Sequence, residues 1–300
     1  MDTRENITPE FVVIGAGGFL GSALVRTLVE MGHAVAGTYR KHQVDAPGIA
    51  LVGDLEDEIY CRRIAETPGT LIYAAAFKKN ISVHTAEPFT TFVENVSPLL
   101  KLLKALEKSP PRPLIYASSI LIGSHEVDAK LHDGYVDGKT AGEMAVVCFR
   151  NQYAWPVAIL RIASIYGPGN DVNPKTANVV PALITRVAQS EGRVDCWGSG
   201  QRRVQFSYID DAVRALLHVA MNPSDIPYCS VGNEESISID GLVMDIASQL
   251  GKDVEIVHDL SKPDKETALF HFTNPVQPEV SVHDGVARTI AWMKQNGYVE

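Results

Sequence analysis

The stretch from Phe11 to Gly21 restricts the fold of this chain more than any other part of the sequence. It reads Phe-Val-Val-Ile-Gly-Ala-Gly-Gly-Phe-Leu-Gly. Its first four apolar residues predict a short buried strand, and apolar residues recur with a helical period from Phe19 to Met31. Glycines at positions 15, 17, 18 and 21 lie at the junction of the two. The sequence therefore predicts a strand, a tight turn and a helix in succession.

The glycine turn predicts a binding site for a diphosphate. Gly15 and Gly18 have no Cβ, so a diphosphate can approach the backbone, and Gly21 lets the helix pack close to the strand. The free N–H groups at the helix start, with the helix dipole behind them, favour an anion. The alternative is a turn with a purely structural role. Because the turn follows a strand and opens a helix, as a dinucleotide site requires, we favour the dinucleotide site.

Length and charge narrow the class of protein. The 300 residues are long for one compact core and fit a nucleotide domain with a smaller second domain. No apolar run reaches about 18 residues, so we expect no membrane span. Residues 1–10 lack the apolar core of a signal peptide, which predicts a cytoplasmic protein. The net charge of −9 gives no electrostatic reason to expect a nucleic acid as partner.

The cysteines and histidines predict neither disulfides nor a metal site. The four cysteines, at positions 61, 148, 196 and 229, are far apart and form no C-x-x-C pair, so we expect buried reduced thiols. The nine histidines are dispersed and form no H-x-x-x-H or mixed cysteine and histidine cluster. We therefore expect no metal.

The residues after the second predicted strand, His33 to Thr38, indicate which dinucleotide is bound. A fold that prefers NAD places a carboxylate about 20 residues after the glycines, whereas one that prefers NADP presents a cation there. This chain reads Tyr39-Arg40-Lys41. Arg40 can stack on adenine and clamp a 2′-phosphate, so NADP(H) is preferred and NAD(H) remains possible. The alternative is a solvated charge cluster at a strand end.

The third and fourth predicted strands end in further candidate cofactor contacts. Residues 49–52 lead into Asp54 and Leu55, where the carboxylate of Asp54 can accept from the adenine amino group. A plain helix N-cap is the competing use of Asp54. The fourth strand, 70–76, ends in Ala74, Ala75 and Ala76, small residues that leave room for a ligand across the strand end. Lys78 and Lys79 follow in a loop that faces the same crevice.

A long helix is predicted from about Pro88 to Lys108. Asn95 in its middle weakly disfavours a helix, which suggests a functional or buried role, although an exposed helical Asn is the alternative. Leucines at positions 99, 100, 102, 103 and 106 make the helix apolar on more than one side. This distribution suits a subunit interface as well as packing on the sheet.

The fifth predicted strand, 114–117, ends in Ser118 and Ser119, and Tyr135 and Lys139 follow at the head of a helix that reaches about residue 152. A four-residue spacing puts Tyr135 and Lys139 on one helical face. A nearby ammonium lowers the pKa of a phenol from about 10, so we expect Tyr135 to exchange a proton with a substrate oxygen near neutral pH. Ser118 would hold that oxygen. A chance match to this short pattern is the alternative.

At this point the sequence clearly resembles the extended short-chain dehydrogenase/reductase family, in its NAD-dependent epimerase/dehydratase branch, which acts mostly on nucleotide sugars. The resemblance runs nearly end to end. It rests on the following motifs: the glycine turn, Ala74-Ala75-Ala76, Asn95-Val96, Ser118 with Gly123, Tyr135 to Lys139, Arg161 to Gly169, Asn178-Val179-Val180-Pro181, Trp197-Gly198-Ser199-Gly200 and Phe206 to Asp211.

The resemblance implies an α/β fold, a Rossmann-type doubly wound parallel sheet with a smaller C-terminal α+β substrate lobe. Residues 1–169 and 204–233 would form the dinucleotide domain, and 170–203 with 234–300 the substrate lobe. In this family, the helix at 88–108 and the helix that begins at Tyr135 commonly pair with their copies across a two-fold axis, which implies a homodimer.

The resemblance also implies roles for individual residues. Ser118, Tyr135 and Lys139 would be the catalytic set, Asn95 would support the active-site helix, and Lys78 would lie beside the cofactor. The implied cofactor contacts are Gly15, Gly18, Phe19, Leu20, Gly21, Tyr39, Arg40, Lys41, Asp54, Leu55, Ala74, Ala75, Ala76, Lys78, Asn95, Tyr135, Lys139 and Ile162. The implied contacts with a nucleotide-diphosphate sugar are Ser119, Ser164, Asn178, Val179, Trp197, Arg202 and Arg203.

Departures from the family pattern narrow the reaction. Dehydratases carry an Asp-Glu pair after the catalytic hydroxyl, where this chain has Ser119 and Ile120, which disfavours dehydration. GDP-fucose synthases use a cysteine and a histidine where this chain has Ile120 and Asn178, which disfavours their epimerisation. Val204 replaces an arginine of the family, and the customary C-terminal Leu-Gly-Trp is absent, which predicts a shortened last lobe.

Two oxidoreductase reactions remain. We expect NADPH-dependent reduction of a 4-keto group on a nucleotide-linked deoxysugar, with Tyr135 as general acid, Lys139 tuning it and Ser118 holding the keto oxygen. A 4-epimerase with tightly bound NAD(P) is the alternative, towards which Lys78 points. A non-catalytic NADP-binding sensor is a third possibility. Such sensors tend to lose the Tyr/Lys pair, which this chain retains.

Overall fold

The computed structural model describes residues 8–41, 48–78, 81–122, 133–173, 176–223, 227–261 and 269–300. Lys79 and Gly123, which the sequence analysis named, lie outside these ranges. The chain divides into two compact units. Met1–Arg161 and Val213–Cys229 form the first unit, and Ile162–Ala212 and Ser230–Glu300 form the second. The division of functions between a dinucleotide domain and a substrate lobe stays a prediction.

A seven-stranded sheet forms the centre of the first unit. Its strands lie in the order β10-β6-β5-β4-β1-β2-β3. Their bounds are β1 (Phe11–Ile14), β2 (Val35–Tyr39), β3 (Ile49–Val52), β4 (Thr70–Tyr73), β5 (Leu114–Ser119), β6 (Val157–Ile162) and β10 (Tyr228–Val231). The neighbours from β3 through β2, β1 and β4 to β5 pair in parallel. Because β1 lies between β2 and β4, the order reverses at β1, which confirms the predicted doubly wound sheet.

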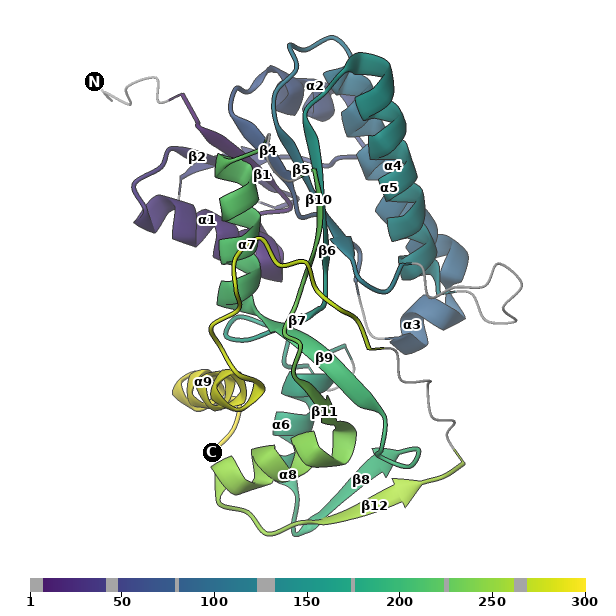
Figure 1. Cartoon of the computed structure of the whole chain (residues 1–300), viewed down its shortest axis with the longest axis vertical. Helices are drawn as coiled ribbons and strands as arrows, with labels where there is room; N and C mark the ends of the chain where they lie inside the picture. The colour runs from purple at the N-terminus through teal and green to yellow at the C-terminus, as the bar shows by residue number, and fades with distance from the viewer. Residues whose placement is uncertain are drawn as a thin grey trace. The chain divides into compact units, whose positions relative to one another are not determined.

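Helices cover both faces of this sheet. They are α1 (Phe19–Glu30), α2 (Glu58–Glu66), α3 (Ile81–Ala86), α4 (Pro88–Leu106), α5 (Gly134–Tyr153) and α7 (Ile209–Met221). Figure 1 shows α4 and α5 side by side along one face of the sheet, with α1 on the opposite face. All four residues of β1 are buried, as its apolar run predicts for a strand covered on both sides.

Three strands have other bounds than the sequence predicted. β2 runs from Val35 to Tyr39 instead of from His33 to Thr38. β4 ends at Tyr73 and does not extend through the alanines, whereas β5 continues to Ser119. Ala74 still donates its N–H to the Ile14 carbonyl (2.9 Å), but the backbone of Phe77 bonds the side chain of Asn95 instead of a neighbouring strand. The chain therefore leaves the sheet between these two residues.

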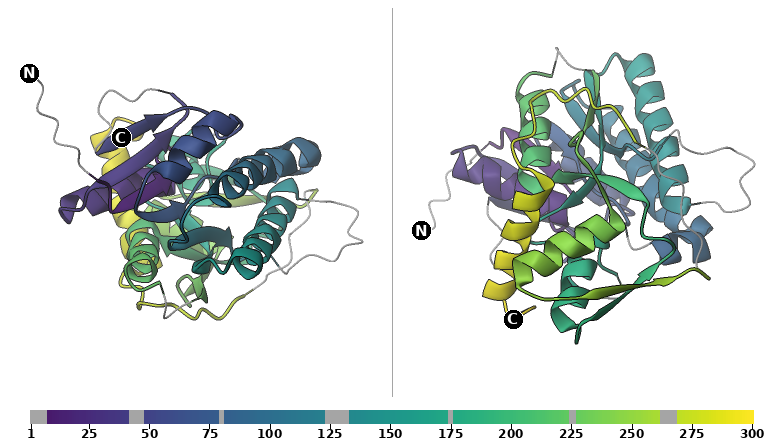
Figure 2. Two further views of the ribbon diagram at one scale, coloured as in Figure 1. Left: turned by 90° about the horizontal axis from the view of Figure 1, so that it is seen from above. Right: turned by 60° about the horizontal axis from the view of Figure 1, so that its bottom comes forward.

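The second unit contains two small sheets and three helices of its own. Strands β7 (Ser164–Tyr166), β9 (Arg203–Tyr208) and β11 (Ser236–Ser238) form one sheet, and β8 (Arg193–Trp197) pairs in parallel with β12 (Glu255–Asp259). Its helices are α6 (Val179–Gln189), α8 (Ile239–Leu250) and α9 (Val282–Gln295). Helix α8 packs against both α6 and α9, and its contact with α9 can be followed in Figure 2.

The chain before α9 is held by a buried carboxylate. Asp211 accepts hydrogen bonds from the backbone N–H groups of Glu279 (3.0 Å) and Val280 (3.1 Å). Within α9, Met293 is fully buried, whereas Trp292 is half-buried and contacts the ring of Tyr298. None of the described helices combines the length and the hydropathy that a membrane span requires.

Candidate active site

The glycine turn after β1 has the backbone geometry that a diphosphate site requires. Gly15 has a positive φ of +89°, and its N–H donates to the hydroxyl of Thr38 (2.9 Å). The N–H of Gly18 donates to the carbonyl of Gly15 (3.0 Å). A Cβ on Gly21 would lie 2.0 Å from that same carbonyl oxygen, so only glycine fits there.

The N-terminus of α1 is open to an anion. Its N-cap residue, Gly18, has no side chain to accept from the first turn, and that turn carries no acidic residue. The first N–H groups of a helix have no partner within the helix, and the dipole favours negative charge there. Phe19 and Leu20, both half-buried, supply two of these groups. The turn and helix therefore fit a diphosphate.

The ends of β1 and β4 meet where the strand order reverses. A Cβ on Gly15 would lie 2.7 Å from backbone atoms of Ala75, so the two strand ends are in close contact. Ala74 and Ala75 are half-buried and Ala76 is exposed. In open α/β sheets, ligands bind outside the carboxyl ends of the strands at this point. The glycines and alanines singled out in the sequence therefore share one place in the first unit.

The basic segment after β2 is only partly exposed. Tyr39 is buried, and Arg40 and Lys41 are exposed. Nη2 of Arg40 lies 3.4 Å from a carboxylate oxygen of Glu94 on α4, and both side chains remain accessible to water. The sequence analysis did not foresee this ion pair, because it joins residues that are 54 positions apart in the chain.

Asp54 does not cap the helix that follows it. Its carboxylate accepts from the N–H of Glu56 (3.0 Å), whereas Asp57 caps α2 by accepting from Ile59 (2.8 Å). The N-cap interpretation of Asp54 is therefore wrong, since the N-cap lies three residues later, at Asp57. Leu55 is half-buried and packs against the core.

Asn95 is buried and fully bonded, so the alternative of an exposed helical Asn is wrong. Its amide nitrogen donates to the carbonyls of Phe77 (3.0 Å) and Thr91 (2.8 Å), and its amide oxygen accepts from the N–H of Phe77 (3.0 Å). A Cβ on Gly138 would lie 2.9 Å from the Cβ of Asn95, so α5 packs closely on α4 at this point. Asn95 therefore links the loop after β4 to the helix that carries Tyr135 and Lys139.

The proposed catalytic side chains converge at the end of β5. Lys139 is buried, and its Nζ donates to the carbonyl of Ala117 (2.9 Å), the residue before Ser118. Tyr135 is buried and hydrogen-bonded to Ser119. The buried hydroxyl of Ser118 has no hydrogen-bond partner among the described residues. An orphaned buried hydroxyl costs stability unless a ligand satisfies it.

The electrostatics of the site differ from the sequence prediction. Burial raises the pKa of Tyr135 to about 12, the hydrogen bond from Ser119 opposes this rise, and the charge of Asp133 adds to it. The prediction of a lowered phenol pKa is therefore wrong for this structure, because loss of hydration dominates. Loss of hydration also lowers the pKa of Lys139 to about 7, helped by the charge of Lys78 and opposed by Glu143.

Lys78 lies beside the same tyrosine. Its Nζ is 5.5 Å from the centroid of the Tyr135 ring. Although Lys78 keeps exposed surface, loss of hydration around its ammonium lowers its pKa, and the charge of Asp133 opposes that effect. The Lys78 ammonium therefore lies beside the Tyr135 ring, whereas Nζ of Lys139 lies 5.1 Å from the centroid of the Tyr116 ring.

Several polar neighbours of this site were missed in the sequence. Asp133 caps α5, which an Asp before a helical run could have indicated. Glu143 forms a bidentate pair with Arg161, with N–O distances of 3.0 and 2.8 Å. His84 of α3 stacks on Tyr135. The sequence contains no local signal for the last two contacts, because each joins elements that meet only in the folded unit.

The predicted substrate contacts, apart from Ser119, lie in the second unit, which also contains Ile162. Ile162 is buried at the end of β6, and Ser164 is exposed at the start of β7. Asn178 is the N-cap of α6 but makes no side-chain capping bond, and Val179 is partly exposed. Trp197 is 62 % exposed at the end of β8.

The two arginines at the start of β9 differ in exposure. Arg202 is half-buried, whereas Arg203 is exposed and donates to the hydroxyl and the carbonyl of Ser236. Their predicted contact with a diphosphate stays a prediction. In the part of the chain that the structure describes, no three histidine, cysteine or acidic side chains gather as a metal ion would require.

Comparisons with known proteins agree with this geometry. A model of the NAD dependent epimerase/dehydratase family matches residues 11–231. Among curated proteins, a dTDP-4-dehydro-6-deoxy-D-allose reductase of Streptomyces bikiniensis is 28 % identical over 84 % of each chain. A probable GDP-L-fucose synthase of Oryza sativa is 24 % identical over 95 % of this chain and 92 % of its own.

Solved structures share the fold. A UDP-glucose 4-epimerase of Thermotoga maritima, solved with UDP-glucose, has a TM-score of 0.83 at 24 % identity and covers 95 % of this chain and 99 % of its own. A Thermus thermophilus UDP-glucose 4-epimerase in complex with NAD has a TM-score of 0.78 at 21 % identity, with coverage of 95 % and 98 %.

Proposed function

Because this chain belongs to the NAD dependent epimerase/dehydratase family of extended short-chain dehydrogenases/reductases, we propose that it reduces a 4-keto group on a nucleotide-linked deoxysugar with NADPH. The observation that carries the proposal is the buried, unpartnered hydroxyl of Ser118 at the strand end where Tyr135 and Lys139 converge. A carbonyl oxygen that accepts from Ser118 would satisfy this group.

The phenol of Tyr135 is suited to act as a general acid. Burial raises its pKa to about 12, so the hydroxyl keeps its proton throughout the neutral range. Reduction of a ketone to an alcohol requires one proton on the former carbonyl oxygen, and Tyr135 would donate it. Ser118 would orient that oxygen, and Lys139 would stabilise the phenolate that remains. The protonated phenol, which is the form that a reduction requires, is therefore the populated form at neutral pH.

The first unit fits a dinucleotide. Gly15, Gly18 and Gly21 would hold its diphosphate at the start of α1, where Ala75 packs directly against the turn. When bound, NADPH supplies the hydride. Arg40 would bind the 2′-phosphate, since its guanidinium is exposed and its partner Glu94 is accessible to water and readily exchanged.

Arg40→Ser should weaken NADPH binding by about 10- to 100-fold and leave NADH binding within about threefold, because only NADPH carries the phosphate that the arginine clamps. Dissociation constants from quenching of protein fluorescence would measure this. Glu94→Gln is the matched variant. It frees Arg40 from an exposed ion pair, so NADPH should bind up to about fivefold more tightly. Equal losses for both cofactors in Arg40→Ser would contradict the assignment.

The substrate assignment follows the relatives. The two curated relatives above are named for reduction of a dTDP-linked 4-keto sugar and for GDP-fucose synthesis, so a nucleotide-diphosphate sugar is the proposed substrate class. Exposed Trp197 would stack on the base. Ser119, Ser164, Asn178 and Val179 would contact the sugar and the diphosphate, with Arg202 and Arg203 as further anion partners.

The proposal is tested by mixing purified protein, NADPH and a nucleotide-linked 4-keto-6-deoxy sugar. We expect absorbance at about 340 nm to fall in proportion to the keto sugar added, since each reduction uses one hydride. If the protein leaves NADPH unchanged but interconverts two nucleotide sugars, it is a 4-epimerase and not a reductase.

A 4-epimerase with tightly bound NAD(P) is the second candidate function. The position of Lys78, 5.5 Å from the Tyr135 ring, favours it, because a second cation beside the phenol stabilises the phenolate that oxidation of an alcohol requires. Such an enzyme would retain its cofactor through purification, which the absorbance of the isolated protein would reveal.

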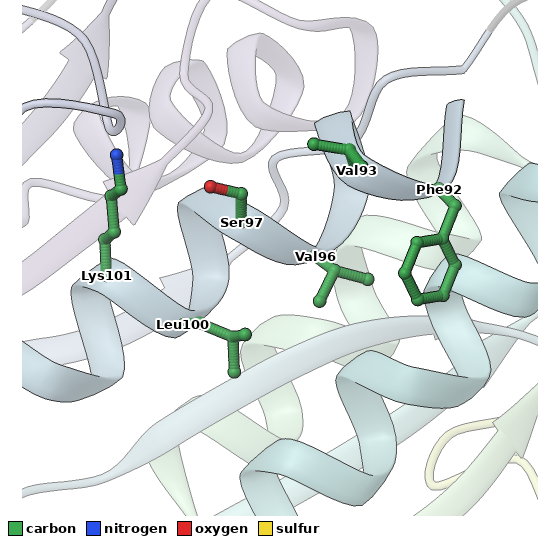
Figure 3. A pocket seen from close by; sticks show the side chains of 6 residues that line it. All are labelled: Phe92, Val93, Val96, Ser97, Leu100 and Lys101. Carbon is green, nitrogen blue, oxygen red and sulfur yellow. The ribbon is translucent and has the colours of Figure 1, made fainter. Parts of the chain in front are cut away.

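We also propose a homodimer through α4 and α5. Phe89 and Leu100 on α4 and Met144 on α5 are exposed, and a groove lined partly by Phe92 and Val96 runs along α4. Figure 3 shows Val96 and Leu100 on one side of this helix. Burial of such exposed apolar side chains against a second copy of the chain would stabilise a dimer.

Leu100→Glu should convert this dimer into a monomer at micromolar concentration, because a carboxylate would be buried at the contact. Mass measured by light scattering during size-exclusion chromatography would report the change. An unsubstituted chain with the mass of a monomer under the same conditions would contradict the dimer.

A further inference from the structure

The ring of Tyr135 is packed against a buried histidine. His84, on α3, is 4 % exposed, and its imidazole stacks on the phenol with ring centroids 5.2 Å apart and an interplanar angle of 16°. Nζ of Lys78 lies 5.5 Å from the centroid of the same phenol. His84 thus restricts the plane of the Tyr135 ring, although His84 itself does not belong to the proposed catalytic set.

A carboxylate connects the same histidine to the backbone of α5. Nδ1 of His84 lies 3.5 Å from Oδ1 of Asp133, and both side chains are nearly buried. That oxygen also accepts from the N–H groups of Tyr135 (3.0 Å) and Val136 (3.4 Å). His84 therefore contacts the ring of Tyr135 and also Asp133, the residue that caps α5, in whose first turn Tyr135 lies.

We propose that His84 is a positioning residue for Tyr135, whose imidazole, held by Asp133, fixes the plane of the phenol and so the direction of its hydroxyl. A tyrosine side chain has two soft torsions, and a flat partner on its face removes most freedom in the second. Proton transfer requires the hydroxyl within hydrogen-bond reach of the substrate oxygen. The inference rests on the proposed function, because only there does Tyr135 donate a proton.

His84→Ala should lower kcat for keto-sugar reduction by about 10- to 100-fold, because a small misplacement of a catalytic group has effects of this size. KM and the NADPH dissociation constant should stay within about threefold, since His84 is assigned no contact with either ligand. His84→Phe keeps a flat ring on the phenol and should restore kcat to within about fivefold of wild type. His84→Gln keeps a polar group for Asp133 but has no ring, so its kcat should stay low.

His33 offers a matched control in the same unit. It also contacts an aromatic ring, that of Phe11 (centroids 5.1 Å apart), and a carboxylate, that of Glu10 (3.0 Å). His33→Ala should therefore remove the same kind of contacts and leave kcat unchanged. Thermal unfolding of all variants would separate a loss of folded protein from a loss of turnover.

A readout without substrate keeps the inference separate from the proposed function. In protein labelled with ¹³C-tyrosine, the Tyr135 ring signal is assigned by its loss in Tyr135→Phe. We expect slow ring flips in the wild type and faster flips in His84→Ala, but not in His33→Ala. Unchanged flips, unchanged kcat in His84→Ala, or equal losses in His84→Phe and His84→Ala would overturn the inference. Faster flips in a protein without reductase activity would support it and refute only the proposed function.

Discussion

Tyr135→Phe is expected to lower kcat/KM for keto-sugar reduction by about 10³-fold, because the variant lacks the proton that the former carbonyl oxygen must receive. NADPH affinity should change by less than about threefold, since the ring and its packing against His84 are preserved. Steady-state kinetics and a fluorescence titration with NADPH measure the two quantities. The structure adds a reason for this contrast, because the phenol is buried and protonated at neutral pH.

Tyr73→Phe is the matched control for this prediction. Tyr73 is as buried as Tyr135 and ends β4 in the same unit, but the proposed chemistry does not use it. Its replacement should leave turnover unchanged. If Tyr135→Phe also turns over normally, Tyr135 is not the acid. If the unsubstituted protein binds NADPH but reduces no keto sugar, the sensor interpretation replaces the enzyme.

Lys139→Met is expected to abolish most turnover and to stabilise the folded protein at pH 7. Burial lowers the pKa of Lys139 to about 7 in the folded state, whereas an unfolded lysine keeps a pKa of about 10.4. Between these values the unfolded chain binds a proton that the folded protein does not, so wild-type stability rises with pH across this range. Below pH 7 the ammonium is charged in both states, and the full cost of burying it is present.

The methionine variant has no such proton to lose, so position 139 should no longer contribute to the pH dependence of its free energy of unfolding. The advantage over wild type should reach up to about 5 kcal/mol at pH 7 and decline towards pH 10.5. Urea unfolding at several pH values would measure it. Lys104→Met, on the exposed side of α4, is the control and should change neither stability profile nor turnover. A methionine variant less stable than wild type at pH 7 would show that the Lys139 ammonium is well solvated or paired.

The stabilisation expected in Lys139→Met also has a functional meaning. A buried ammonium with one carbonyl partner, that of Ala117, destabilises the fold. A phenolate formed at Tyr135 would supply the negative charge that this ammonium lacks. Under the proposed function, proton donation by Tyr135 would therefore also relieve the cost of the buried Lys139 ammonium.

Local rules were accurate where neighbours along the chain determine the outcome. The bounds of β1 and β3 and the start of α1 matched the pattern of apolar residues and glycines, and the pair Tyr135 and Lys139 lies on one helix as predicted. The same rules were wrong for Asp54. The N-cap is the residue directly before the helix, and for α2 this residue is Asp57.

By itself, the sequence determined the succession of elements from β1 to α5 in outline, the glycine turn at the start of α1 and the residue types at the end of β5, because each of these depends on residues close together in the chain. Only the tertiary structure decided which side chains from other elements contact these residues. The bonds from Asn95 to Phe77, the stack of His84 on Tyr135 and the pair of Arg40 and Glu94 join separate elements. The direction of the phenol pKa was decided in the same way, since burial is a property of the whole packed unit and no short stretch of sequence specifies it.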